Sequence, residues 1–207
     1  PPNSAQFDEA VALLKNLSAL DTKGKITDHG KALAALPLHP RLAHMLKLSG
    51  PQAAGLAALL ADRDPLQRGA PGDLALRLEA LSDPKRFEQR RPYKIERPIL
   101  ERIKLETRRL KPFCPDISPN FSKAQMAAMA YPDRIAMRRK GLPPRYLLSS
   151  GKGAILVAED SPLTQRLLVA TDLDGDPKEA RIRTAISISE AELRELFALQ
   201  ICWQNTC

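Results

Sequence analysis

The chain has 207 residues, a hydrophobic content of 43%, a charged content of 27% and a formal net charge of +8. This composition is typical of a folded, soluble chain and excludes an intrinsically disordered one, while the length favours two or three small domains over one. No run approaches the roughly 18 apolar residues of a membrane-spanning helix, and the sequence offers no secretory leader, so we expect no membrane partner and a cytoplasmic location.

The residue types that most often bind metals do not form a recognisable set. The odd number and wide spacing of the three cysteines indicate reduced thiols. His39 and His44 are five residues apart across Pro40, which is poor spacing for ligands on one helix. We therefore expect no metal site and interpret the histidines as surface or cap residues. Because the chain opens with Pro1 and not Met, we also expect a fragment of a longer protein.

The N-terminal elements are predicted from apolar spacing and turn residues. A first helix is indicated by steps of three and four between Phe7, Val11, Leu14 and Leu17. The Asp-x-x-Gly pattern from Asp21 to Gly24 is a turn signal, because Asp bonds its own backbone and Gly accepts positive φ. A short extended piece, Lys25 to Thr27, is expected after it.

Two prolines predict the next pair of helices. Thr27 or Asp28 can cap a helix that Pro37 ends, since the residue before a proline is pushed out of the α region. Pro40 then suits the first turn of another helix. The expected result is a short ribbon, a helix, a proline-bracketed corner and a second helix.

The middle of the chain is predicted to be helical. Ala53 to Leu60 is small and apolar throughout and should be a largely buried helix that Asp62 to Pro65 stops. Asp73 can cap a helix with Leu74, Leu78 and Leu81 on one side and Leu76 off that stripe. A longer helix is expected from Ile95 to Lys111, whose narrow apolar arc contains Ile95, Ile99, Ile103 and Leu110.

Positive charge is concentrated in the segment from Lys85 to Lys111. It contains eleven cationic residues and four glutamates, so its net charge is 11 − 4 = +7. An acidic partner is implied, and the phosphate backbone of a nucleic acid is the leading candidate. The alternative is a solvated helix face on which glutamates such as Glu101 and Glu106 merely pair with neighbouring arginines.

The segment from Lys111 to Ser122 has three prolines and no periodicity, which predicts a linker. Ala124 to Tyr131 is expected to form a short helix that Pro132 breaks. Asp133 can then cap a further helix carrying a dense cationic cluster, namely Arg134, Arg138, Arg139 and Lys140.

Strand-like runs dominate the remainder. We expect strands at 145–149, 154–158, 166–171 and 180–188, with Asp174 and Gly175 as a tight turn between the last two. Ser189 and Glu192 form a capping box for a final helix. Short strands with a closing helix suit a small barrel.

The chain carries no recognisable catalytic machinery. Gly151, Lys152 and Gly153 only mimic a phosphate-binding loop, because the first glycine and the following Ser or Thr are absent. Three aspartates between 172 and 176 resemble the start of a calcium loop, but Pro177 replaces the required glycine, so we interpret them as a hairpin turn. Aromatic residues make up only 4% of the chain, and Tyr131, Tyr146 and Trp203 are the best candidates for base stacking, although both tyrosines could equally be core residues.

Several motifs resemble a known family. The string ALD..GKIT..GKALAALPLHPRLAHML, from residue 19 to residue 46, resembles the winged-helix segment that follows the two motor domains of DEAH-box helicases. The strings LLADRDPL, DLALRLEAL, AYPDRIAMRR and EARIRTAISISEAEL resemble the C-terminal half of a bacterial branch of that family. The resemblance covers almost the whole chain.

The resemblance implies an α+β fold class, with an N-terminal winged helix and helical bundle followed by a small oligonucleotide-binding-like (OB-like) β-barrel with a terminal helix. The implied divisions are a winged-helix domain at 1–48, a ratchet-like helical bundle with linker at 49–120, and a C-terminal domain with the barrel at 121–207.

The resemblance also implies the function of an accessory region that completes the single-strand channel and supports the motor domains of an ATP-dependent RNA helicase. The expected partners are single-stranded RNA or another nucleic acid and those motor domains, which would hold ATP and Mg²⁺; we expect no cofactor or catalytic residue in this chain, which should be inactive alone. The alternative is a protein-interaction module whose basic helix docks an acidic partner or the motor domains. The predicted phosphate contacts are Arg102, Arg108, Arg109, Arg134, Arg138, Arg139 and Arg145.

Overall fold

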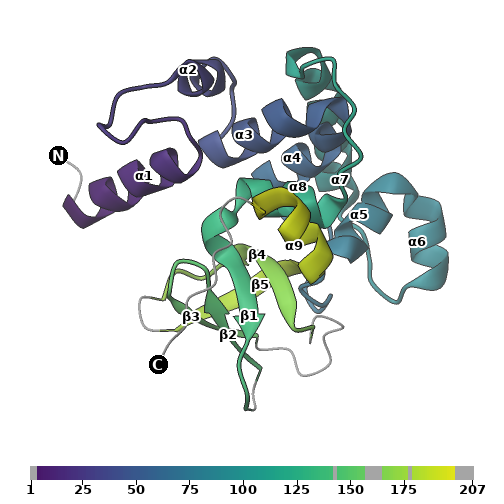
Figure 1. The fold of residues 1–207 in the computed structure, drawn as a ribbon. Coiled ribbons are helices and arrows are strands. Elements are labelled where there is room, and N and C mark those ends of the chain that lie inside the picture. The colour runs from purple at the N-terminus through teal and green to yellow at the C-terminus, as the bar shows by residue number, and fades with distance from the viewer. Residues whose placement is uncertain (1–3, 142–143, 157–164, 177–178, 199–207) are drawn as a thin grey trace.

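The computed structural model describes residues 4–141, 144–156, 165–176 and 179–198, which form a helical part and a β-barrel (Figure 1). The α-helices are α1 (Ser4–Asn16), α2 (Asp28–Ala34), α3 (Pro40–Ser49), α4 (Ala54–Ala61), α5 (Leu74–Ser82), α6 (Pro84–Arg90), α7 (Arg97–Leu110), α8 (Lys123–Ala130) and α9 (Glu190–Phe197). Short 3₁₀ turns are η1 (Gly50–Ala53), η2 (Lys111–Phe113) and η3 (Pro132–Arg134). The strands are β1 (Ile135–Arg138), β2 (Arg145–Leu148), β3 (Gly153–Leu156), β4 (Leu167–Leu173) and β5 (Ala180–Ser187).

The predicted N-terminal helices are confirmed, together with the residues that begin them. The Thr27 hydroxyl accepts a hydrogen bond from the Gly30 amide at 2.9 Å, so Thr27 and not Asp28 caps α2. Pro40 occupies the first turn of α3, where its missing amide costs no hydrogen bond. The expected ribbon is reduced to a single antiparallel bridge between Leu20 and Ile26.

Helix α8 lies between the helical part and the barrel. It packs against α3 on one side and against β4 and β5 on the other, and every residue from Ala124 to Ala130 is buried. Four alanines and two methionines supply this helix with small or adaptable side chains, which allows close approach on all sides. The main hydrophobic core is therefore continuous from α2 to β5.

A second, smaller core supports the outer helices α5 and α6. Phe87 is fully buried there, and it shares this core with Leu66, Leu76, Ile95 and Leu100. Leu76, which lies off the leucine stripe of α5, is buried because α6 and the chain before α7 cover that side. The sequence did not predict α6, whose seven residues contain only one buried side chain.

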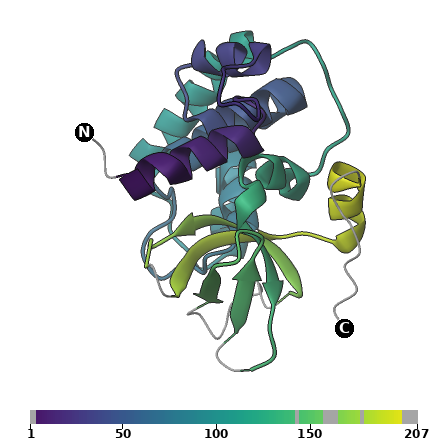
Figure 2. The same ribbon diagram turned by 60° about the vertical axis from the view of Figure 1, so that its left-hand side comes forward.

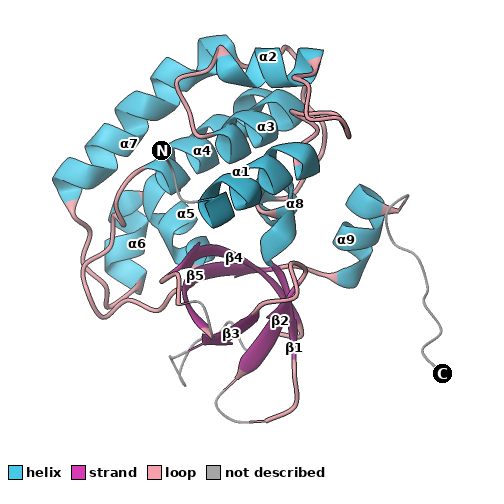
Figure 3. Ribbon diagram, turned by 90° about the vertical axis from the view of Figure 1, so that its left-hand side faces the viewer, coloured by secondary structure: helices cyan, strands magenta, loops and turns pink. Residues whose placement is uncertain are grey.

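The five strands form a closed barrel in the order β1-β2-β3-β5-β4 (Figures 2 and 3). Neighbouring strands are antiparallel except β3 and β5, which are parallel with Ala154 opposite Ala180. Alternate residues fill the interior, including Tyr146 and Leu168, and closure leaves no unpaired sheet edge. The expected α+β class with a small barrel and a terminal helix is confirmed.

One predicted helix is wrong. Asp133 does not cap a helix that carries Arg134, Arg138 and Arg139; a single 3₁₀ turn ends at Arg134, and strand β1 follows. Strand β1 pairs with both β2 and β4, so its backbone groups are satisfied by two ladders. These partners are distant in sequence, which explains why local capping signals missed them.

The other C-terminal predictions agree with the structure to within a few residues. Strands β2 and β5 each end one residue earlier than expected, β4 ends two residues later, and the end predicted at residue 158 lies outside the described residues. The capping box of Ser189 and Glu192 is present at the start of α9. Asp174 and Gly175 lie in the β4–β5 connection, where the Asp174 carboxylate accepts a hydrogen bond from the Arg181 amide at 2.8 Å. The predicted divisions near residues 48 and 120 stay a prediction, and the main core crosses both positions.

Two of the three histidines form a pair that joins α2 to α3. His29 Nε2 and His44 Nδ1 are 2.8 Å apart, with their rings edge to face. Burial, followed by the charge of His29, lowers the pKa of His44 to about 4. His39 instead caps α3, where its Nδ1 accepts from the Arg41 amide.

Acidification is expected to destabilise the chain through this histidine pair. Because the pKa of His44 falls from 6.5 in the unfolded chain to about 4 on folding, the unfolded chain binds protons more tightly. The free energy of unfolding is therefore highest above pH 6.5, where His44 is neutral in both states. It decreases by about 2–3 kcal/mol as the pH falls to 4. Urea unfolding between pH 7 and pH 4 measures it, and His44→Gln should flatten the pH dependence in this range; an unchanged slope would contradict the assignment.

Candidate nucleic-acid interface

The β1–β2 hairpin carries the densest group of predicted phosphate contacts and extends from the barrel away from the helices (Figure 1). Arg138 lies opposite Tyr146 in the antiparallel register, and the Arg139 amide donates to the Arg145 carbonyl at 2.8 Å. Strand side chains alternate, so Arg138 and Arg139 leave the hairpin on opposite faces and not on the common helix surface that the sequence predicted. Arg139 and Lys140 are exposed and form no ion pair among the described residues.

Arg134 and Arg145 belong to the same end of the chain but are bound differently. Arg145 is 56% exposed and forms an ion pair with Glu179 at 3.1 Å. The guanidinium of Arg134 lies 5.1 Å from the centre of the Tyr131 ring, and burial lowers its pKa. Arg134 is therefore committed mainly to packing, because a cation over an aromatic face is stabilised by the ring.

The three arginines predicted on α7 also differ in their availability. Arg102 pairs with Asp62, and its hydrogen bond lowers the pKa of that carboxylate. Arg109 pairs with Glu106 at 3.0 Å, while Arg108 is exposed with no ion pair among the described residues. The alternative of pairing along the helix is thus correct for Arg109. The charges of Arg102 and Arg109 are thus neutralised locally, and of the three predicted contacts on α7 only Arg108 has no ion-pair partner among the described residues.

The structure does not bring the two groups of arginines together. Helix α7 packs against α4 within the helical part, whereas the β1–β2 hairpin extends from the barrel on the side away from the helices (Figure 3). The two tyrosines predicted as candidates for base stacking are core residues, because Tyr131 is 8% and Tyr146 is 1% exposed. Trp203 lies outside the described residues. Contact with phosphates and not with bases is the chemistry that these surfaces support.

A buried ion pair that the sequence did not reveal positions the start of the barrel. Arg41 on α3 donates to Asp133 through both terminal nitrogens, one of them at 2.9 Å, and also to the Ala130 carbonyl. Burial would raise the pKa of Asp133, but the hydrogen bond and charge of Arg41 outweigh it and lower that pKa. Arg41 also lies over the Tyr131 ring from a distance of 5.2 Å. The pair therefore fixes the turn that precedes β1.

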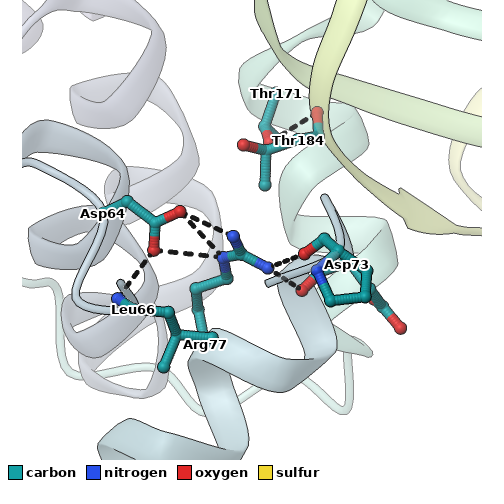
Figure 4. A network of polar contacts seen from close by, with 7 residues as sticks. Asp64, Leu66, Asp73, Arg77, Thr171 and Thr184 are labelled. Carbon is teal, nitrogen blue, oxygen red and sulfur yellow. Dashed lines mark hydrogen bonds and ion pairs between the residues drawn. The ribbon is translucent and has the colours of Figure 1, made fainter. Parts of the chain in front are cut away.

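A second buried arginine orders the segment of chain that meets strand β5. Arg77 on α5 is held by the Asp64 carboxylate and by the Pro71 and Asp73 carbonyls, next to Thr171 and Thr184 of the barrel (Figure 4). The chain around Asp73 pairs with Ala185 of β5. A cleft of about 530 Å³ between α4 and the barrel has charged groups of both signs in its lining, namely Asp62, Asp64, Asp172, Arg77 and Arg183.

Comparisons with known proteins agree with this architecture. Residues 10–38 match the helicase associated domain (HA2), winged-helix. Over 53 residues the chain is 42% identical to a probable ATP-dependent RNA helicase, DHR1, of Saccharomyces cerevisiae. These 53 residues are 26% of this chain and 4% of the yeast protein. Two crystal structures of HrpB from Escherichia coli, described as a DExH-box NTPase and as a DEAH/RHA helicase, superpose with TM-scores of 0.67 and 0.62 at 29% and 26% identity. They cover 96% and 99% of this chain.

The chain is similar to the C-terminal region of HrpB. It spans about 23% of the length of each HrpB chain that it matches, so it corresponds to an accessory part of such a helicase. The winged helix and the barrel of the HrpB-like chain are both confirmed by this match. Among the described residues, no helix is long and apolar enough to cross a membrane.

Proposed function

We propose that this HrpB-like chain is the accessory nucleic-acid-binding region of a DEAH-box ATP-dependent RNA helicase. In this proposal it forms part of the single-strand channel and supports the motor domains, which bind ATP and Mg²⁺, and the protein acts in the cytoplasm. The observation that carries the proposal is the β1–β2 hairpin, whose exposed cations Arg139 and Lys140 have no acidic partner among the described residues. The similarity to helicases over the whole chain supports the same class of partner.

The proposed contact is electrostatic and independent of base sequence. A strand that neutralises the hairpin cations would release counterions, so its affinity should fall steeply with salt. The barrel fixes the backbone at the base of the hairpin, because the Arg138 amide donates to the Arg166 carbonyl at 2.8 Å on the side opposite β2. Little backbone entropy is then lost at this position on binding.

Charge reversal of Arg139 and Lys140 to Glu tests this proposal. The affinity for a fluorescent oligouridine should fall at least tenfold, and the slope of log K against log salt should decrease by about 1.4, because two phosphate contacts are lost. Lys23→Glu with Lys25→Glu is the matched control, since both lysines are exposed, have no ion-pair partner among the described residues and lie in the turn before α2. If the hairpin variant keeps the affinity and the slope of the unmodified chain, the hairpin is not a phosphate contact.

Helix α7 favours the second candidate function, contact with a protein. Leu105 is 64% exposed on this helix, and Phe113 just after its end is 44% exposed. Exposed apolar side chains at the edge of a basic surface are typical of protein interfaces and add nothing to phosphate binding. We therefore propose that α7 docks an acidic partner or the motor domains, while the barrel hairpin holds the strand.

A further inference from the structure

Helix α6 and the chain that follows it form an outlying lobe, defined as residues 83–97 (Figure 1, right-hand edge). The lobe is well anchored, because Phe87 is fully buried and Ile95 is only 7% exposed in the smaller core. A bridge between Leu66 and Ile95, with the Gln67 amide donating to the Lys94 carbonyl at 3.0 Å, joins the segment around Arg68 to the lobe. Its surface is therefore presented in a defined arrangement.

The cations of this lobe fall into two classes. Arg91 pairs with Glu79, and Arg97 pairs with Glu88, so those two charges are locally neutralised. Within the described residues, five other exposed cations on the lobe and the adjoining segment have no ion-pair partner, namely Arg68, Lys85, Arg86, Arg90 and Lys94. The Asp83 carboxylate is occupied by the Arg86 amide at the start of α6. These five cations are therefore available to bind an anionic partner.

The chemistry of the surrounding surface selects the class of partner. Protein interfaces require apolar or aromatic anchors at their centre. The exposed large apolar side chains of the described residues all lie outside 62–100, and Tyr93 packs against the smaller core. A charged surface without an apolar centre is suited to a phosphate backbone, which is bound mainly by Lys and Arg.

We propose that Arg86, Arg90 and their unpaired neighbours form a second phosphate-binding surface for a nucleic-acid strand, distinct from the barrel hairpin. The inference rests on the proposed function for the presence of a nucleic acid. Arg86 and Arg90 are one helical turn apart, so both side chains leave the same side of α6. The lobe lies away from the hairpin, and a strand that contacts both surfaces must pass along the molecule (Figure 3).

Two double variants with equal charge changes provide the test. Arg86→Gln with Arg90→Gln removes two unpaired cations, and Arg91→Gln with Arg97→Gln removes two paired cations from the same lobe. For a fluorescent 20-nucleotide oligouridine, the first variant should lose about 1.4 from the slope of log K against log salt and bind several-fold more weakly at roughly 0.1 M salt. The second should keep the slope of the unmodified chain.

If both variants lose the same amount of affinity and salt slope, the effect is one of net charge and the inference is wrong. The inference is also wrong if neither variant loses affinity. Thermal unfolding of each variant verifies the fold. If Arg86→Gln with Arg90→Gln abolishes binding of a polyglutamate peptide but leaves oligouridine binding intact, the surface takes an acidic protein and the inference is wrong. The hairpin variant at Arg139 and Lys140 reports separately on the proposed function, so the two ideas can fail independently.

Discussion

Replacing Arg41 by alanine is expected to lower the free energy of unfolding by about 3 kcal/mol. The Arg41 side chain is 9% exposed and its partner Asp133 is 24% exposed, so the substitution leaves a mostly buried carboxylate without its cation. It also leaves the Ala130 carbonyl without the Arg41 donor and removes one cation from the Tyr131 ring. Urea unfolding followed by circular dichroism measures the change.

A matched control separates burial from charge. Arg97→Ala also breaks an arginine–glutamate pair, but both side chains are more than one-third exposed, so the loss should be below about 1 kcal/mol. Replacing both members of the buried pair, Arg41→Met with Asp133→Leu, should recover part of the stability, because no uncompensated charge remains. Equal effects of Arg41→Ala and Arg97→Ala would contradict the role given to the Arg41–Asp133 pair.

Replacing Gly50 by alanine is expected to cost about 3–4 kcal/mol. Gly50 ends α3 with φ 71° and ψ −161°, a conformation that is essentially restricted to glycine. A Cβ atom there would also lie 2.1 Å from the Ile117 carbonyl oxygen, so the 111–122 segment would have to move. Thermal and urea unfolding of the variant give the size of the effect.

Gly24 provides a control that separates the cost of a positive φ from the cost of a steric clash. Its φ of 80° is similarly positive, but no heavy atom lies within 4 Å of the position that a Cβ would take. Gly24→Ala should therefore cost only about 1 kcal/mol. If Gly50→Ala is no more destabilising than Gly24→Ala, the close approach of Ile117 does not constrain the chain as the structure indicates.

The candidate site could be predicted only in part. Sequence reasoning identified Arg108 and Arg139 as cations, and both are exposed, but it could not show that Arg102 meets Asp62 from a distant segment or that Arg134 packs on Tyr131. Net charge is additive along a chain, whereas pairing depends on which residues fold side by side. The phosphate contacts themselves stay a prediction.

For helix α6 the sequence predicted the positive charge but not the helix. Its cations were counted in the basic segment from Lys85 to Lys111, yet the helix was not predicted, because only Phe87 among its seven residues is buried. Apolar periodicity needs at least two turns with a common buried side to be detected. The distinction between the paired Arg91 and the unpaired Arg90 came entirely from the packing of α5 against α6.

The amino-acid sequence by itself determined the local elements of this protein. Thr27, Pro40 and the Ser189–Glu192 box begin helices through bonds or backbone limits within a few residues, and the motifs around them carry the likeness to DEAH-box helicases. Only the tertiary structure decided that Asp133 binds Arg41, 92 residues away, in place of capping a helix, and that β1 closes the barrel between β2 and β4. Such contacts depend on surfaces that exist only after the elements have packed, so no local pattern can encode them.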